Sequence, residues 1–240
     1  METYTFQEVL YMKKWIPVCS VAIVMILLFG ILTDHAVTVF SESAPIENRV
    51  CVVIDAGHGG EDGGATSCTG ELESQINLQI ALRLNDLLHL IGIDTKMIRT
   101  TDRSVFTEGN TISARKLSDL KERVKIINNT ENAILISVHQ NTFPEKIYHG
   151  AQVFYGIRGE GEALAKQMQH NFVSTLNLGS NRKAKKANSV YLMDKIKCTG
   201  VLVECGFISN PQEAALLNSV EYQNKVCIVI ASTLSTFLYS

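Results

Sequence analysis

Two histidines follow runs of apolar residues that are typical of buried strands. The run at residues 52–54 leads through a short glycine turn to His58, and the run at residues 133–138 ends directly in His139. Because ligands of open α/β folds bind at the carboxyl ends of strands, we expect both imidazoles at one edge of one sheet. Neutral imidazole is the commonest metal ligand, and catalytic zinc usually takes three protein ligands and leaves one position open. The pattern predicts a metal site that needs one more ligand.

A carboxylate closes a third apolar run. Residues 200–203 end at Glu204, and the following Asn210-Pro211 pair predicts the start of a helix. An acid at the end of a buried strand costs desolvation free energy unless it is paired or takes part in chemistry. Beside two histidines, a carboxylate that takes part in chemistry is favoured over a salt-bridged acid at the sheet edge.

Four acids compete for the third ligand position: Glu61, Asp62, Glu71 and Glu73. Glu61 forms a His-x-x-Glu pair with His58, a spacing that some zinc peptidases use. Glu73 begins a strongly amphipathic helix, and a carboxylate at a helix N-terminus is electrostatically favoured. This ranks Glu73 first by a small margin, although the same acid suits a first helical turn without any metal.

Six segments, in order along the chain, carry a resemblance that covers about residues 50–238. They are Ile54-Asp-Ala-Gly-His-Gly-Gly, Glu73-Ser-Gln-Ile-Asn-Leu78, Ile98-Arg-Thr-Thr-Asp102, Leu120-Lys-Glu-Arg-Val-Lys-Ile-Ile-Asn128, Ser137-Val-His-Gln-Asn141 and Val203-Glu-Cys-Gly-Phe-Ile-Ser-Asn210. The chain resembles the zinc-dependent N-acetylmuramoyl-L-alanine amidases of the amidase-3 type. The resemblance implies that His58, Glu73 and His139 bind Zn²⁺ and that Glu204 is the catalytic acid/base. The implied reaction is hydrolysis of the amide between N-acetylmuramic acid and L-alanine in peptidoglycan.

Two further segments narrow the resemblance within this family. The sequence Thr107-Glu-Gly-Asn110 and the basic run at residues 182–186 before Val190-Tyr-Leu-Met193 resemble the branch that acts on spore cortex in endospore formers. In that branch the stem peptide is removed so that muramic-δ-lactam, which germination requires, can form. Three alternatives remain: a vegetative cell-wall amidase in cell separation, a different zinc peptidase that uses His58 and Glu61, and an inactive peptidoglycan-binding protein.

Several residues near the predicted site have both a structural and a functional interpretation. Asp55 either orients His58 or caps the glycine turn. Arg115 and Arg123 are expected to form helix salt bridges rather than to bind substrate carboxylates. The basic run at residues 182–186 is typical of a solvated loop, but in a wall enzyme it is also suited to anionic stem peptides.

The chain as a whole alternates between strand-like and helix-like segments. Such alternation predicts an α/β domain with a mixed, mostly parallel sheet and helices on both faces. Beyond the runs already described, we expect strands near residues 93–98, 151–155 and 189–193, and helices over 73–91, 117–127, 164–176 and 226–238. Cys205 should point away from Glu204 and pack as a small hydrophobe, because side chains alternate along a strand.

The N-terminal part predicts a membrane anchor. Lys13 and Lys14 precede residues 15–33, which contain no charge, so we expect a cytoplasmic N-terminus at 1–14, a transmembrane signal anchor at 15–33, a linker at 34–48 and an amidase catalytic domain at 49–240. A cleaved signal peptide is the less favoured alternative. The catalytic domain would lie outside the cytoplasm, in a spore former between the two forespore membranes. The expected partners are peptidoglycan and the membrane, with an accessory protein left open, and a net charge of −2 argues against nucleic acid.

Overall fold

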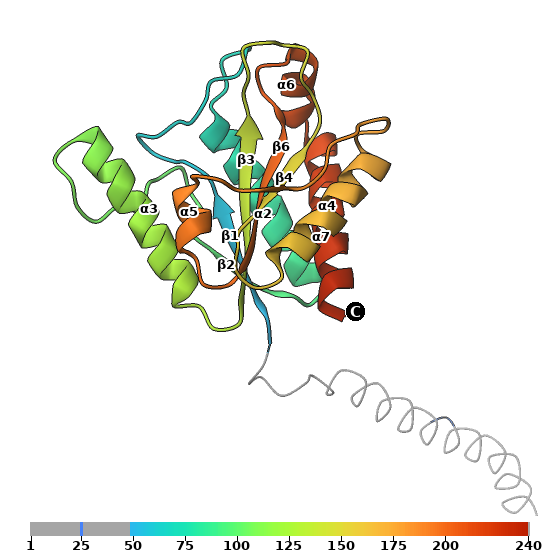
Figure 1. The fold of residues 1–240 in the computed structure, drawn as a ribbon, viewed down its shortest axis with the longest axis horizontal. Helices are drawn as coiled ribbons and strands as arrows, with labels where there is room; N and C mark the ends of the chain where they lie inside the picture. Colours follow the sequence, from blue (N-terminus) through green and yellow to red (C-terminus); the bar gives the residue numbers. More distant parts are fainter. Residues whose placement is uncertain (1–24, 26–48, 240) are drawn as a thin grey trace, which may run out of the picture. The chain divides into compact units, whose positions relative to one another are not determined.

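Six strands form one sheet in the order β2-β1-β3-β6-β4-β5 (Figure 1). The computed structural model describes Met25 and residues 49–239. The strands are β1 (Cys51–Ala56), β2 (Asp94–Met97), β3 (Ala133–Asn141), β4 (Gln152–Tyr155), β5 (Lys185–Lys186) and β6 (Thr199–Phe207). All neighbouring strands are parallel except β4 and β6, which pair antiparallel. The predicted mixed, mostly parallel sheet is confirmed.

Helices cover both faces of this sheet, as the sequence predicts. They are α2 (Glu73–Leu90), α3 (Ile112–Asn128), α4 (Gly161–Thr175), α5 (Tyr191–Lys195), α6 (Pro211–Leu217) and α7 (Val220–Tyr239). Helices α2, α4 and α7 pack on one face of the sheet, and α3 and α5 pack on the other (Figure 1). Alternation along β1 explains the two cores, because Val52 and Ile54 enter the first and Val53 enters the second.

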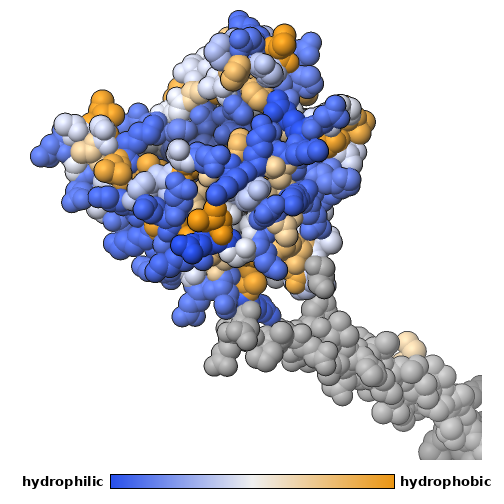
Figure 2. All heavy atoms as spheres, in the orientation of Figure 1, coloured by the Kyte–Doolittle hydropathy of each residue, from blue (hydrophilic) through white to orange (hydrophobic). Residues whose placement is uncertain are grey.

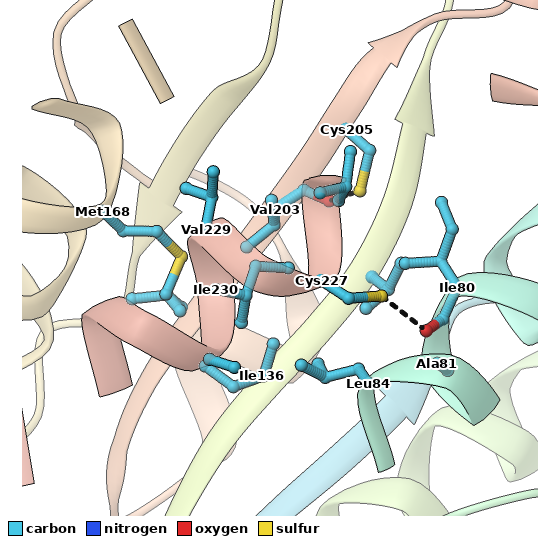
Figure 3. Packing of buried hydrophobic residues seen from close by; sticks show 14 of the residues in the cluster. Ile80, Ala81, Leu84, Ile136, Met168, Val203, Cys205, Cys227, Val229 and Ile230 are labelled. Atoms are coloured by element: carbon cyan, nitrogen blue, oxygen red, sulfur yellow. Dashed lines mark hydrogen bonds between the residues drawn. The ribbon is translucent and has the colours of Figure 1, made fainter. Parts of the chain in front are cut away.

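The core beneath α2 and α7 holds two of the cysteines (Figure 3). Cys227 on α7 lies against α2, where its Sγ atom donates a hydrogen bond to the carbonyl oxygen of Ile80 at 3.4 Å. Cys205 is fully buried in the same core, on the same face of β6 as Val203. The prediction that Cys205 packs as a small hydrophobe away from Glu204 is therefore confirmed.

The segment near residues 189–193 differs from the prediction. It forms the short helix α5, and the strand beside β4 is instead β5, which pairs with Phe154 and Tyr155. Leu192, Met193 and Ile196 are all buried in the core that includes α3. A helical turn directs residues with this spacing to one side, whereas a strand would send Leu192 and Met193 to opposite faces.

The turn into α6 agrees with the sequence. Asn210 is the N-cap residue, and its Oδ1 atom accepts hydrogen bonds from the backbone N–H groups of Gln212 at 2.9 Å and Glu213 at 3.2 Å. Pro211 occupies the first helical turn, where its missing N–H group costs nothing.

The predicted N-terminal segments at 1–14, 15–33 and 34–48 lie outside the described residues, apart from Met25. Within the part of the chain that the structure describes, no helix combines the length and the apolar character that a membrane crossing needs.

Candidate active site

Three side chains with metal-ligand chemistry converge at the carboxyl end of the parallel strands. His58 follows β1, Glu73 begins α2 and His139 lies near the end of β3, and their ligand atoms lie within 4.8 Å of one another. The Oε2 atom of Glu73 is 3.3 Å from Nε2 of His58, and its Oε1 atom is 3.0 Å from Nδ1 of His139. The structure thus brings together the three residues that the sequence nominated as metal ligands.

The strand register places Glu204 beside this cluster. Parallel pairing of β3 with β6 makes His139 and Glu204 direct neighbours, so both side chains leave the sheet on the same face. The Oε2 atom of Glu204 is buried and has no hydrogen-bond partner among the described residues. Burial raises the pKa of Glu204 to about 7. The carboxylate is therefore not the salt-bridged edge acid that the sequence left as an alternative.

Two glycines make room for the cluster. A Cβ atom on Gly57 would lie 2.2 Å from the Cε1 atom of His139, well inside van der Waals contact. Gly64 has a φ of +68°, and a Cβ atom there would lie 2.6 Å from Oε2 of Glu73. These glycines therefore do more than turn the chain: because Gly57 and Gly64 have no side chains, the metal-ligand atoms of His139 and Glu73 can lie close to the loop.

Backbone and amide groups hold the Glu73 carboxylate in place. Its Oε1 atom accepts hydrogen bonds from the backbone N–H of Gln140 at 3.2 Å and from Nδ2 of Asn77 at 3.3 Å, and its Oε2 atom accepts one from the N–H of Ala65 at 3.0 Å. Burial alone would raise the pKa of Glu73, but hydrogen bonds and charge from His139 and His58 hold it well below its usual range. The carboxylate is thus kept ionised, as a metal ligand must be.

Two buried arginines fasten the His58 loop through its carbonyl oxygens. Arg99 donates to the carbonyls of Ala56 at 2.8 Å and Gly57 at 3.0 Å. Arg123 donates to the carbonyls of Ala56 at 3.0 Å and His58 at 2.8 Å. Sequence reasoning gave Arg99 no role, although it lies in the segment Ile98-Arg-Thr-Thr-Asp102 that is part of the family resemblance.

Asp55 does not contact His58 in the way that one sequence interpretation supposed. Its carboxylate pairs with Arg123 and accepts a hydrogen bond from Oγ of Ser137 at 2.7 Å. The acid that orients the His58 imidazole is Asp62, whose Oδ2 atom is 2.8 Å from Nδ1. The sequence analysis treats Asp62 only as a competing ligand, whereas the geometry places its carboxylate against the imidazole of His58.

The other candidate acids lie outside the cluster. Glu61 is largely exposed and pairs with Arg115 at 2.7 Å. Glu71 accepts hydrogen bonds from the hydroxyl groups of Ser67 and Thr69 in a neighbouring turn. The His58-x-x-Glu61 pair therefore does not form a ligand pair in this structure. Arg123 forms the expected helix salt bridge with Asp119 at 2.6 Å, whereas the ion pair of Arg115 joins α3 to Glu61 in the glycine loop.

A cavity of about 340 Å³ opens over the cluster. Its walls come from the ends of β1 and β3, from one side of α3, and from the segment that leads into α5. Its lining includes His58, His139, Lys116, Ser189 and Tyr191. Such a cavity exposes both imidazoles to a ligand while the core beneath them stays closed.

Comparison with known proteins agrees with this arrangement. The sequence pattern of the amidase-3 family, described as N-acetylmuramoyl-L-alanine amidase, matches residues 52–236. The chain therefore belongs to this family of peptidoglycan amidases.

Individual relatives extend the match over nearly the whole chain. The chain is 38% identical over 216 residues to the germination-specific N-acetylmuramoyl-L-alanine amidase of Bacillus subtilis, covering 89% of this chain and 90% of that protein. The CwlD amidase of Clostridioides difficile, solved in complex with the GerS lipoprotein, superposes with a TM-score of 0.76 at 33% identity over 80% of this chain and 99% of that one. The amidase AmiC2 of Nostoc punctiforme gives a TM-score of 0.68 at 29% identity over 80% and 98%.

Proposed function

We propose that this amidase is zinc-dependent, with His58, Glu73 and His139 as the metal ligands and Glu204 as the general acid/base. The amide that it hydrolyses joins N-acetylmuramic acid to L-alanine in peptidoglycan. The observation that carries the proposal is the convergence of two imidazoles and an ionised carboxylate beside Glu204, whose buried Oε2 atom has no hydrogen-bond partner in the described part of the chain.

The chemistry of the three side chains fits zinc. Zinc binds imidazole nitrogen and carboxylate oxygen, and catalytic sites combine three such ligands with one open position. Nε2 of His58 faces Glu73 while Nδ1 contacts Asp62, the carboxylate–histidine arrangement that fixes the orientation of a ligating ring. Bound zinc would supply Lewis-acid chemistry, polarising an amide carbonyl and making a water molecule more acidic.

Glu204 is suited to moving the proton. A carboxylate with a pKa of about 7 is poised to accept a proton near neutral pH and to release it again. In the proposed reaction, Oε2 takes a proton from the attacking water and delivers it to the departing nitrogen of L-alanine. Arg99 and Arg123 contribute by holding the His58 loop rigid from beneath.

Purified full-length protein with measured zinc content tests this assignment. Alanine at His58, Glu73 or His139 should remove both zinc and activity, whereas Glu71→Ala should keep both. Glu204→Gln should keep zinc and fold but lose turnover by at least the ~10²–10⁴ that positioned proton transfer contributes. Loss of zinc in Glu204→Gln would instead place this carboxylate among the ligands.

Mass spectrometry of digested peptidoglycan separates the alternative reactions. Intact stem peptides released from muramic acid support the amidase. Shortened peptides would point to a peptidase that uses His58 and Glu61, and unchanged peptidoglycan would point to an inactive binding protein.

For the biological role, we propose spore cortex, as a step toward muramic-δ-lactam. The names of the Bacillus subtilis relative and the complex of CwlD with a lipoprotein support this role and an accessory protein. The proposal includes a cytoplasmic N-terminus at 1–14, an anchor at 15–33, a linker at 34–48 and a catalytic domain at 49–240 outside the cytoplasm. Deleting the gene should leave cortex without lactam. Normal lactam together with chained cells would favour vegetative cell separation instead.

A further inference from the structure

The cations around the site differ in whether an acid neutralises them. Lys116, in the cavity over the cluster, pairs with Asp62 at 3.1 Å, and Arg115 pairs with Glu61. Arg182 has no ion pair with any carboxylate of the described residues. Its positive charge is therefore uncompensated, unlike the cations on the α3 side of the site.

Arg182 is nevertheless held in a defined orientation. Its Nε atom donates to the carbonyl of His149 at 3.1 Å, its Nη1 atom donates to Oε1 of Gln152 at 3.4 Å, and its guanidinium lies over the Phe207 ring at 4.9 Å from the centroid. These are contacts to neutral groups. They order the guanidinium and use Nε and one N–H of Nη1, which leaves the other Nη1 N–H and both N–H groups of Nη2 to face a carboxylate.

The sheet register places this guanidinium near Glu204 and the metal-ligand cluster. His139 pairs with Glu204, and Glu204 pairs with Gln152, so the three side chains form a row on one face across β3, β6 and β4. With strands ~4.8 Å apart, the row spans about 10 Å. Arg182 contacts the Gln152 end of this row.

One chain segment joins the cluster to Arg182. The connection from α4 to α5 runs across the sheet, orange in Figure 1, with β5 paired to β4 and Ser189 in the cavity over the metal cluster. Near β4 it borders an open groove of about 640 Å³. The lining includes three cations, Arg182, Lys183 and Lys185, and no acid among the described residues.

One acid, Glu213, interacts with this charge without forming an ion pair with Arg182. Glu213 influences Arg182 only at a distance, and its carboxylate accepts hydrogen bonds from the N–H groups of Gly150 at 2.9 Å and Phe207 at 2.7 Å. Burial raises the pKa of Glu213, while these two hydrogen bonds act to lower it. The face drawn in Figure 2 is largely hydrophilic, with hydrophobic residues in separate small groups, as suits a polar polymer.

We propose that Arg182 binds a free carboxylate of the stem peptide and so determines which stem peptides are cut. This inference rests on the proposed function, because it assumes that the amide is hydrolysed at the metal cluster, which lies at the His139 end of the row. An extended peptide advances ~3.3–3.6 Å per residue, so a span of about 10 Å places the bound carboxylate two or three residues beyond the cut amide. The planar guanidinium matches such a carboxylate with two parallel hydrogen bonds.

Two synthetic muramoyl peptides that differ only in having free or amidated stem carboxylates provide the test. Zinc-loaded wild-type protein should have a KM at least tenfold lower for the free acid. Arg182→Gln should raise KM for the free acid about 10- to 100-fold, leave kcat within about twofold, and leave the amidated substrate unchanged. Arg182→Lys should recover part of the loss, and Arg158→Gln, at an exposed arginine beyond the opposite end of β4, should behave as wild type.

The outcomes separate this inference from the proposed function. Wild-type protein that cuts neither substrate would contradict the proposed function itself. Wild-type protein that cuts both equally well would overturn the carboxylate site without any variant, even if Arg182→Gln failed to fold. Equal losses on both substrates in Arg182→Gln would show that Arg182 only supports the structure.

Discussion

Replacing Gly57 by alanine should displace His139 and weaken zinc binding. The backbone at Gly57 lies outside the positive-φ region, so alanine adds no conformational strain there. Its Cβ atom would lie 2.2 Å from Cε1 and Nε2 of His139, whereas ordinary contact begins at 3.4 Å. The imidazole must therefore move by about 1.2 Å, the difference between these two distances. Such a shift would break the 3.0 Å contact with Glu73.

Two measurements follow from this displacement. Zinc affinity, measured by competition with a chelator, should fall by at least about 100-fold, because moving a ligand exceeds the ~10–100-fold cost of losing a supporting group. Overpacking of about 1–3 kcal/mol should lower the Tm of the metal-free protein by about 2–12 °C. Hydrolysis of peptidoglycan should fall with zinc occupancy.

Gly63→Ala in the same loop is the matched control. Its backbone also has no positive φ, and its Cβ atom would meet Cδ2 and Cδ1 of Leu72 at 3.1 and 3.2 Å. A flexible leucine needs to yield only a few tenths of an ångström, so zinc affinity should stay within about threefold of wild type. Wild-type zinc affinity in a folded Gly57→Ala protein would show that His139 is not the ligand assigned here.

Two further predictions concern carboxylates around the cluster. Asp62→Asn should weaken zinc binding about 10- to 100-fold, because the His58 ring loses the carboxylate that orients it, whereas Glu61→Gln should leave zinc binding unchanged. Competition with a chelator measures both affinities. Weakened binding in Glu61→Gln alone would support the peptidase alternative. Burial raises the pKa of Glu204 in the folded protein from 4.5 to about 7. Between pH 4.5 and about 7 the folded metal-free protein therefore binds more protons than the unfolded chain. Its stability falls as the pH rises through this range. Urea unfolding of metal-free protein at pH 5 and pH 8 should therefore show a smaller loss for Glu204→Gln than for wild type, and equal losses would mean that Glu204 ionises normally in the fold.

The sequence by itself determined that three apolar segments would present His58, His139 and Glu204 at one edge of a sheet. The apolar runs that lead to His58, His139 and Glu204 can be recognised without knowing their neighbours in the sheet, because burial dictates the composition of central parallel strands. Parallel strands then deliver their carboxyl ends to one edge, so the approach of these side chains follows from local pattern and topology. The amphipathic helix from Glu73 and the cap at Asn210 were equally local.

Pattern and spacing alone left residues of the same chemistry undecided; the family resemblance named Glu73, and only the tertiary structure supplied the physical reason. Glu61, Asp62, Glu71 and Glu73 lie within 13 residues of one another, and spacing alone does not say which carboxylate faces β3. That choice depends on where the first turn of α2 packs, which the contacts of Glu73 with Gln140 and His139 reveal.

The arginines give a clearer example of what a sequence pattern cannot predict. Arg99 and Arg123 become parts of the site because each reaches carbonyl oxygens of the His58 loop from a distant segment. Arg182 becomes a candidate for substrate binding because it contacts Gln152, which the pairing of β4 with β6 sets beside Glu204. A sequence pattern reports which face of its own element a residue occupies, but a long cationic side chain acts through partners far away in the chain, and only folding brings them within hydrogen-bond distance.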